Sequence, residues 1–457
     1  MSAPSVVIVG AGPAGLAAAR RLVAAGLRPV VLEEATRPGG QGTRRLAPSV
    51  APHGDRLFRQ SAPGIRARES AEDAVLAQCD FRPGTLVWAC HGDRLELLGP
   101  AGYESLPYSH LLLAVGATDR LMPLPGWTLP GVFTLGGAQV ALKRHGSFIG
   151  ERVVFAGSSP LLYLAAAQYL RLGHRQLTVL DTTPFSQKMR HFPAMLRHAP
   201  RTALQGVALM AELRRGGVQI ISGARLLAVE GDDRVTALRY ATARGTRLRL
   251  GVDAVALGYG LRPETQLAEL AGAVFDYDAR HRQWFARCDA VGRAGPRLWI
   301  AGDSARTAGA EAADAAGALA AEDILETLGL PAADPLEIRA YRRRLRAQRK
   351  FQDAMTGAFQ WPASRLADLP DETTLCRCER VSLGTVRAAL DAPLGPVEIN
   401  RVKSITRCGM GRCQGRFCGP ALSELVAAAR EATPGRLRAQ APVRPIPLVA
   451  PHREAAE

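Results

Sequence analysis

The chain has 457 residues and a mass of 48.7 kDa, which is enough for two or three domains with substantial cores and excludes a single small binding module. With 47% hydrophobic and 22% charged residues, 46 Gly and 31 Pro, the composition lies near the average of globular proteins. This composition argues against wholesale disorder and against a fibrous repeat.

The charge balance is strongly basic, because 58 Lys and Arg exceed 42 Asp and Glu and give a net charge of +16. A nucleic-acid partner would explain such an excess, but the basic residues are scattered and only 5% of residues are aromatic, too few for base-stacking platforms. An acidic partner subunit is the more economical explanation, and we expect no nucleic-acid ligand. No apolar stretch reaches the ~18 residues of a membrane span, and the apolar N-terminus lacks the basic region of a signal peptide. We therefore expect a cytoplasmic protein.

The first motif is a nucleotide-binding fingerprint at the N-terminus. A short apolar strand, residues 5–9, leads into Gly10-Ala-Gly12-Pro-Ala-Gly15 and a helical pattern. A second strand, residues 29–32, ends at Glu33, near the ~20-residue spacing expected for a ribose-binding carboxylate. Glycines in this pattern allow a tight turn, close approach of a pyrophosphate and close packing of helix on strand. The predicted dinucleotide-binding residues here are Gly10, Gly12, Pro13, Ala14, Gly15, Glu33 and Glu34.

A second strand–helix–strand pattern covers residues 152–181 and has a damaged fingerprint. Its strand enters Gly157-Ser-Ser159-Pro-Leu-Leu162, so Ser159 and Leu162 stand where the second and third glycines belong. These side chains disfavour the usual approach of a nicotinamide dinucleotide. A nicotinamide site, an adenine-nucleotide site and a structural remnant all remain open for this unit.

Two later strand ends carry further candidate residues. Residues 111–114 run into a glycine turn at Gly116, and residues 298–300 run into Gly302 and Asp303 before a small-residue helix. A carboxylate in that position can accept a hydrogen bond from a ribityl hydroxyl of a flavin. The alternative for Asp303 is an ordinary helix N-cap.

These segments occur in the order found in two-dinucleotide-binding-domain flavoproteins, and residues 1 to about 330 resemble the pyridine-nucleotide-disulfide oxidoreductases. The resemblance implies an α/β, Rossmann-like fold, with an FAD-binding domain at 1–149 and 250–330 and a second nucleotide-binding-type domain at 150–249. It adds Gly40, Gln41, Ala114, Gly116, Gly302 and Asp303 to the FAD site. No Cys-x-x-Cys occurs in this part, so disulfide reductase chemistry lacks its redox pair and the flavin must pass electrons elsewhere.

Five of the eight cysteines cluster near the C-terminus, at positions 376, 378, 408, 413 and 418. Four thiolates can hold a [2Fe-2S] cluster, and a glycine-rich loop supplies backbone N–H groups to its sulfurs. Zinc is the competing interpretation, but structural zinc usually shows paired short spacings, which one Cys-x-Cys and one Cys-x4-Cys fit poorly. Basic residues near the cysteines would raise the reduction potential of a cluster. The alternative is that they are ordinary solvated side chains in an arginine-rich protein. These residues are Arg377, Arg380, Lys403, Arg407, Arg412 and Arg416.

The strings Cys-Arg-Cys-Glu and Thr-Arg-Cys-Gly-Met-Gly-Arg-Cys-Gln-Gly-Arg-Phe-Cys resemble the bacterioferritin-associated ferredoxin (BFD) type of [2Fe-2S] domain. The resembling variant ends the α subunits of opine oxidases, hydrogen cyanide synthase, D-hydroxyproline dehydrogenase and dye-linked L-proline dehydrogenase. The resemblance implies a small helical domain at 371–435, after a linker helix region at 331–370 and before an extended tail at 436–457. The ligands that it implies are Cys376, Cys378, Cys413 and Cys418, with Cys408 as a spare thiol.

The resemblance implies an electron-transfer α subunit of a hetero-oligomeric dehydrogenase for an amino or imino acid of the opine, D-hydroxyproline, proline or glycine type. A β subunit that contains FAD and resembles D-amino-acid oxidase would oxidise the substrate, and electrons would pass through this chain to a respiratory acceptor. The resemblance also allows a small γ subunit, FMN at a subunit interface, and ATP, ADP or NAD(P) in the second nucleotide site. We expect no catalytic acid or base here, because none of the nine His joins a recognisable constellation with a nucleophile. The alternatives are a self-contained NAD(P)H-dependent FAD/[2Fe-2S] oxidoreductase and a non-enzymatic iron–sulfur partner protein.

Overall fold

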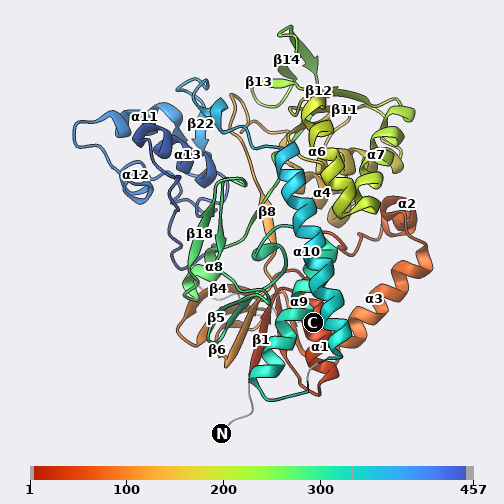
Figure 1. The fold of residues 1–457 in the computed structure, drawn as a ribbon. Helices are drawn as coiled ribbons and strands as arrows, with labels where there is room; N and C mark the ends of the chain where they lie inside the picture. The colour runs from red at the N-terminus through yellow and green to blue at the C-terminus, as the bar shows by residue number, and fades with distance from the viewer. Residues whose placement is uncertain (1–4, 332, 449–457) are drawn as a thin grey trace, which may run out of the picture.

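The computed structural model describes residues 5–331 and 333–448 and arranges them as two α/β domains and a C-terminal helical domain (Figure 1). The first domain is built on a six-stranded sheet of order β20-β21-β7-β1-β2-β3, in which only the β20–β21 pair is antiparallel. Its strands are β1 (Val6–Val9), β2 (Val30–Glu33), β3 (Asp80–Pro83), β7 (His110–Leu113), β20 (Arg293–Gly295) and β21 (Leu298–Ile300).

The first sheet is covered on both faces, as its apolar strands require. Alternate residues of β1 enter two cores: Val6 and Ile8 pack toward the helices, whereas Val7 and Val9 pack toward a small antiparallel sheet. The helices are α1 (Pro13–Ala24), α3 (Ala62–Leu76) and α9 (Ala310–Thr327). The opposite layer contains β4 (Leu86–His91), β5 (Arg94–Gly99), β6 (Gly102–Pro107) and α8 (Gln266–Leu270).

The second domain holds a fully parallel five-stranded sheet of order β12-β11-β10-β16-β9. Its strands are β9 (Val132–Thr134), β10 (Val153–Gly157), β11 (Leu177–Asp181), β12 (Gln219–Ser222) and β16 (Ala254–Gly258). On one side lie η1 (Ala51–His53), α2 (Gly54–Phe58), α4 (Leu135–His145), α5 (Leu161–Arg171) and α7 (Pro200–Arg215). On the other side lies the meander of β13 (Arg225–Glu230), β14 (Ala237–Ala241) and β15 (Arg247–Gly251).

The predicted limits of this domain, 150–249, are too narrow. Strands β9 and β16 both belong to its sheet, and β16 lies between β10 and β9. The first and second domains are joined instead by the short antiparallel pair of β8 (Ala117–Asp119) and β17 (Leu261–Pro263). Residues 254–258 are an apolar run, but such a run contains no signal for which of two parallel sheets it joins.

The predicted linker helix region forms α10 (Pro335–Ala358), which packs on both domains (Figure 1). Leu345 packs against α9, whereas Phe351, Ala354 and Ala358 pack against α6 (Phe185–His198) and the start of α7. The stripe Arg339, Arg342, Arg343, Arg346 and Lys350 stays exposed on its outer face. The helix therefore fixes the two domains relative to one another.

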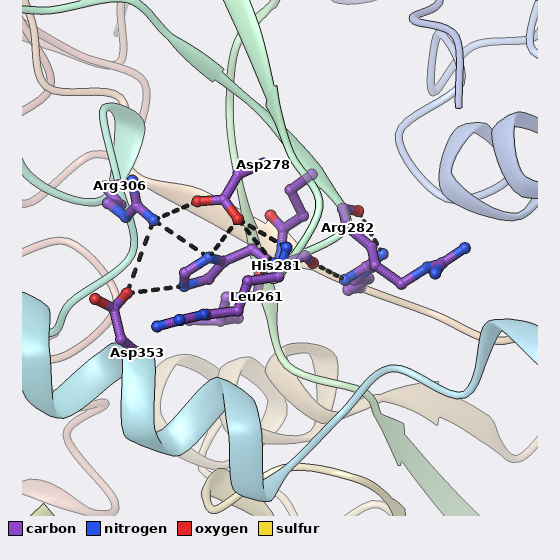
Figure 2. Close-up of polar contacts among 9 residues, drawn as sticks. Leu261, Asp278, His281, Arg282, Arg306 and Asp353 are labelled. Atoms are coloured by element: carbon purple, nitrogen blue, oxygen red, sulfur yellow. Dashed lines mark hydrogen bonds and ion pairs between the residues drawn. The ribbon is translucent and has the colours of Figure 1, made fainter. Parts of the chain in front are cut away.

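A polar network around the buried His281 connects α10 to the hairpin of β18 (Phe275–Asp278) and β19 (Gln283–Ala286), as Figure 2 shows. The His281 ring lies 3.1 Å from Asp278 through Nδ1 and 3.4 Å from Asp353 of α10 through Nε2. Arg306 pairs with Asp278 at 2.6 Å. Burial lowers the pKa of His281 despite these carboxylates.

The C-terminal domain contains η3 (Ala363–Leu366), β22 (Thr374–Cys376), β23 (Val381–Ser382), α11 (Leu383–Asp391), α12 (Ile399–Thr406) and α13 (Gly419–Arg430). Its core is continuous with that of the second domain, and the Trp127 indole donates a hydrogen bond to the Thr374 carbonyl at 2.6 Å. Residues 436–448 of the expected extended tail form no helix or strand and lie on this chain's own first domain, where the Val443 N–H donates to the Trp88 carbonyl. Residues 449–457 of that tail lie outside the described residues.

Within the described part of the chain, no helix combines the length and the apolar composition needed to cross a membrane.

Candidate functional site

A cavity of about 990 Å³ opens at the carboxyl ends of the parallel strands of the first sheet. The fold brings most of the predicted FAD-site residues to its wall, although they come from four separate stretches of the chain. Those that line it are Gly10, Gly12, Pro13, Ala14, Glu33, Glu34, Gly40, Gln41, Ala114, Gly116 and Asp303. Gly15 and Gly302 do not line the cavity but pack behind its wall.

The glycine turn between β1 and α1 has the conformation that the fingerprint predicts. Gly10 has φ +103°, and a Cβ there would lie 2.4 Å from the Ala114 carbonyl oxygen. A Cβ at Gly15 would lie 1.8 Å from the Gly10 carbonyl oxygen, so both positions exclude a side chain. At Gly12 the nearest atom would be 3.8 Å away, and no side chain caps the start of α1. The N-terminus of α1 therefore presents free N–H groups and a partial positive charge to the cavity.

Two carboxylates line the cavity at strand ends, each held by backbone donors. Glu33 accepts hydrogen bonds from the N–H groups of Ala11 at 2.8 Å and Ala35 at 2.9 Å. Asp303, in η2 (Gly302–Ser304), accepts hydrogen bonds from the N–H groups of Ala308 at 2.9 Å and Gly309 at 3.2 Å. Burial raises the pKa of both side chains. Carboxylate lone pairs that remain free can accept hydrogen bonds from sugar hydroxyls.

Glu34, the second predicted acid of the strand end, has a different partner. Its carboxylate lies 3.4 Å from the guanidinium of Arg444 in the C-terminal tail. The sequence contains no pattern that would join these two residues, because the tail reaches Glu34 only through the tertiary fold.

Three cations outside the predicted motifs also line the cavity: Arg44, Lys143 and Arg144. Lys143, at the end of α4, is only 3% exposed, and none of the three forms an ion pair among the described residues. Burial and the charge of Arg44 lower the pKa of Lys143 to about 8. Like charges without a carboxylate partner favour an anionic ligand.

The cavity thus offers an open helix N-terminus, two hydroxyl-accepting carboxylates and three unpaired cations. This donor set fits a dinucleotide with a pyrophosphate and two polyol groups, which is the chemistry of FAD.

The five C-terminal cysteines meet in one place beside the start of α13. The sulfurs of Cys376, Cys408 and Cys418 lie within 4.8 Å of one another and are buried. Cys378 and Cys413 contact each other in more exposed positions. The thiols of Cys408 and Cys418 hold the pKa of Cys376 well below its usual value. Cys408, expected as a spare thiol, thus lies inside the group.

Glycines let the cysteine-bearing segments approach one another. A Cβ at Gly411 would lie 2.3 Å from the Cys378 Cβ, so only glycine allows the Cys-x-Cys turn to come this close. Gly409 and Gly415 have positive φ and pack around Leu437 of the tail. Thiolate donors in a glycine-rich loop fit a [2Fe-2S] cluster.

The loop between Cys413 and Cys418 also forms part of the cavity wall, through Arg416 and Phe417. Of the six basic residues predicted around the motif, Arg416 and Lys403 are buried and the other four are exposed. Arg416 Nε lies 2.5 Å from Oε2 of Glu264, which lines the same cavity. The dinucleotide cavity and the cysteine group therefore share a wall.

The second domain offers a poor dinucleotide site at the equivalent edge of its sheet. Asp181, at the end of β11, is fully buried and accepts hydrogen bonds from Tyr163 at 2.5 Å and Lys188 at 2.8 Å. A cavity of about 750 Å³ lies at this edge, and residues 359–365, which follow α10, form part of its wall. Ser158 of the damaged fingerprint donates a hydrogen bond to the Gln360 carbonyl at 2.8 Å. The carboxylate at the end of β11 is thus already paired within the chain, whereas the cavity beside it remains open.

Comparisons with known proteins agree with this arrangement. Residues 4–318 match the pyridine nucleotide-disulphide oxidoreductase family, and residues 374–428 match the BFD-like [2Fe-2S] binding domain. An opine oxidase subunit from Agrobacterium tumefaciens is 36% identical over 97% of this chain and 90% of its own length. Hydrogen cyanide synthase subunit HcnB of Pseudomonas aeruginosa is 34% identical, over 97% of each chain.

Solved structures share the fold at lower sequence identity. The crystal structure of L-proline dehydrogenase from P. horikoshii has a TM-score of 0.69 and 19% identity, and the match covers 97% of this chain and 78% of that one. The T. acidophilum thioredoxin reductase has a TM-score of 0.53 and 19% identity, and the match covers 71% of this chain and 98% of that one. The first match spans all three domains of this chain. The second match covers a fraction of the chain that corresponds in length to the two α/β domains.

Proposed function

The chain belongs to the pyridine nucleotide-disulphide oxidoreductase family, is an oxidoreductase subunit with FAD and a [2Fe-2S] cluster, and, we propose, relays electrons within a heteromeric dehydrogenase for an amino or imino acid. On this proposal, a β subunit with its own FAD oxidises the substrate, of the opine, D-hydroxyproline, proline or glycine type. Electrons then leave through this chain to a respiratory acceptor. A small γ subunit, FMN at a subunit interface and a cytoplasmic location complete the proposal.

The observation that carries the proposal is the shared wall. Arg416 and Phe417 belong to the loop between Cys413 and Cys418, called the cysteine loop below, and they also line the cavity proposed for FAD. Flavin and cluster would then be separated by little more than this loop, with no domain movement needed between them. Electron transfer between two cofactors needs such proximity, whereas substrate chemistry would need a positioned acid or base.

The proposed FAD ligands are the predicted residues that line the cavity. The start of α1 would bind the pyrophosphate, Glu33 a ribose hydroxyl and Asp303 a ribityl hydroxyl. Cys376, Cys378, Cys413 and Cys418 remain the proposed cluster ligands. Cys408, which lies among them, would be a fifth thiol within reach of the iron.

Among the described residues, no cysteine that could support disulfide chemistry lines this cavity. Cys79, Cys90 and Cys288, the three cysteines outside the C-terminal group, do not line the cavity. Burial raises the pKa of each, to about 11 for Cys79 and Cys288. Thiols with a raised pKa are poor nucleophiles, because the thiolate is the reactive form.

The second nucleotide site supports a relay rather than a self-contained NAD(P)H reductase. Hydride delivery needs a nicotinamide dinucleotide at the second domain, where Asp181 is already paired with Lys188 and residues 359–365 form part of the cavity wall. Of the ligands considered for this site, ATP, ADP and NAD(P), the paired Asp181 favours an adenine nucleotide over a nicotinamide dinucleotide.

An anaerobic titration of the purified holoprotein with NADH and NADPH tests the proposal. We expect the flavin band and the broader cluster absorption to stay unchanged over minutes, while dithionite bleaches both. Rapid bleaching by either nucleotide would contradict the proposed relay and establish a self-contained reductase.

A further inference from the structure

A buried ion pair connects the first domain to the cysteine loop. Glu264 directly follows β17, and its own N–H donates to the Gly116 carbonyl at 3.0 Å, which fixes it to the cavity wall. Arg416 lies between Cys413 and Cys418, and its Nε lies 2.5 Å from the Glu264 carboxylate. The two side chains are only 8% and 6% exposed.

Arg416 also holds the backbone around it. One guanidinium nitrogen donates to the Cys413 carbonyl at 3.2 Å and to the Val443 carbonyl of the tail at 2.8 Å. The Arg416 carbonyl in turn accepts a hydrogen bond from Arg262 at 2.9 Å. A single side chain therefore joins the cysteine loop, the first domain and the tail.

The charges around the pair keep it ionised. Burial alone would raise the pKa of Glu264, but the charges of Arg416, Arg262 and Arg444 outweigh burial and lower it. Lys403 is a further buried cation near Cys418. Glu264 is thus a buried negative charge among several cations beside the cysteines.

We infer that Arg416 and Glu264 form a positioning pair that holds the cysteine loop against the flavin cavity and sets the charge between the two cofactors. The inference rests on the proposed function, because it assumes that FAD and the [2Fe-2S] cluster occupy these two sites. Neither residue is assigned a step in substrate chemistry.

Removing either charge of the pair should shift the midpoint potential of the cluster in a direction set by the sign of that charge. A positive charge favours the reduced, more negative cluster, and a negative charge disfavours it. Arg416→Gln should therefore lower the midpoint potential of the cluster, whereas Glu264→Gln should raise it. A merely structural loss would shift both variants in the same direction.

The experiment compares Arg416→Gln, Arg416→Lys and Glu264→Gln in the full-length holoprotein. Arg430→Gln is the matched control, because Arg430 also donates to backbone carbonyls of the C-terminal domain but binds Leu390 and Pro396 instead. Iron and flavin content, the electron paramagnetic resonance spectrum of the reduced cluster and its potential with redox mediators are measured for each.

We expect opposite potential shifts for Arg416→Gln and Glu264→Gln, no shift for Arg430→Gln, and recovery of the potential in Arg416→Lys. Because Lys lacks the planar fork, Arg416→Lys should still transfer electrons from flavin to cluster about tenfold more slowly than the unmodified protein. If Arg416→Gln loses its iron, Glu264→Gln and Arg416→Lys decide the question by the same criteria. Shifts of equal sign, or no shift relative to Arg430→Gln, would overturn the inference.

This test is independent of the electron donor. Mediators and dithionite reduce the cluster whether or not a partner subunit or NADH is the natural source. Bleaching of the cofactors by NADH would thus contradict the proposed relay but would not affect the inference about Arg416 and Glu264. Potential shifts of equal sign in Arg416→Gln and Glu264→Gln would contradict that inference but would not affect the relay.

Discussion

A buried ammonium without a carboxylate partner destabilises the folded protein, and Lys143 is in this situation at the end of α4. The charge of Arg44 lowers the pKa of Lys143 further, and the charge of Arg144 in turn lowers the pKa of Arg44. A bound pyrophosphate would compensate this repulsion, and we therefore propose that the three cations belong to the FAD site. The sequence could not indicate them, because α4 belongs to the second domain and only the tertiary fold brings Lys143 to a cavity of the first.

Replacing Lys143 with Met should weaken FAD binding to the apoprotein by about tenfold, the effect of losing one buried charge-assisted contact. The pKa of Lys143 is about 8 without ligand, and an anionic ligand would raise it. Binding to the unmodified protein should therefore be strongest below pH 8 and weaken as the pH rises above 8. A fluorescence titration of FAD between pH 7 and 9.5 measures both effects; an unchanged pH profile in Lys143→Met would contradict this role.

The residues of the site that the sequence did predict all belong to local motifs. Gly10, Gly15 and Glu33 are fixed by one strand–turn–helix–strand unit, in which each residue's role follows from its spacing. Asp303 could be predicted for the same reason, since it follows a strand end and precedes a small-residue helix. Glu264 has no such pattern around it, and its pairing with Arg416 depends on two segments far apart in the sequence.

Among the elements, the loop from α12 to α13 depends most on glycine. Gly411 lies against Cys378, and Gly409 and Gly415 adopt positive φ angles that other residues rarely adopt. The absence of side chains at these positions lets the two cysteine-bearing segments approach closely. The sequence predicted a glycine-rich loop at the cysteines, but this close approach is visible only in the structure. Strand β16 shows a different dependence, because the choice of sheet for an apolar run is set by tertiary packing and not by its local sequence.

Gly411→Ala should reduce bound iron to roughly half or less of the unmodified level while FAD content stays unchanged, because a Cβ 2.3 Å from Cys378 forces the loop apart. Gly206→Ala, in α7, is the matched control, since a Cβ there meets nothing within 4 Å and alanine favours the helix. Iron and flavin are quantified in both purified variants. Full iron content in Gly411→Ala would show that the loop tolerates the added methyl group.

For the whole molecule, the important property is that three domains enclose one cavity. Residues of the first domain, α4 of the second, the cysteine loop and the tail all line it. The sequence predicted two nucleotide-type domains and a cluster domain in this order, but it contained no information on how the cluster domain docks. That docking depends on tertiary contacts such as Trp127 with Thr374 and Arg416 with Glu264.

The most direct test of the relay is the rate of electron transfer from flavin to cluster within one molecule. A laser flash with a deazaflavin donor reduces the flavin of the anaerobic holoprotein, and the flavin and cluster absorption bands are then followed at several protein concentrations. Because the two sites share a wall, the flavin should reoxidise as the cluster bleaches, at a rate that does not change with concentration. A rate that rises in proportion to protein concentration, or a flavin that stays reduced beside an oxidised cluster, would contradict the proposed relay.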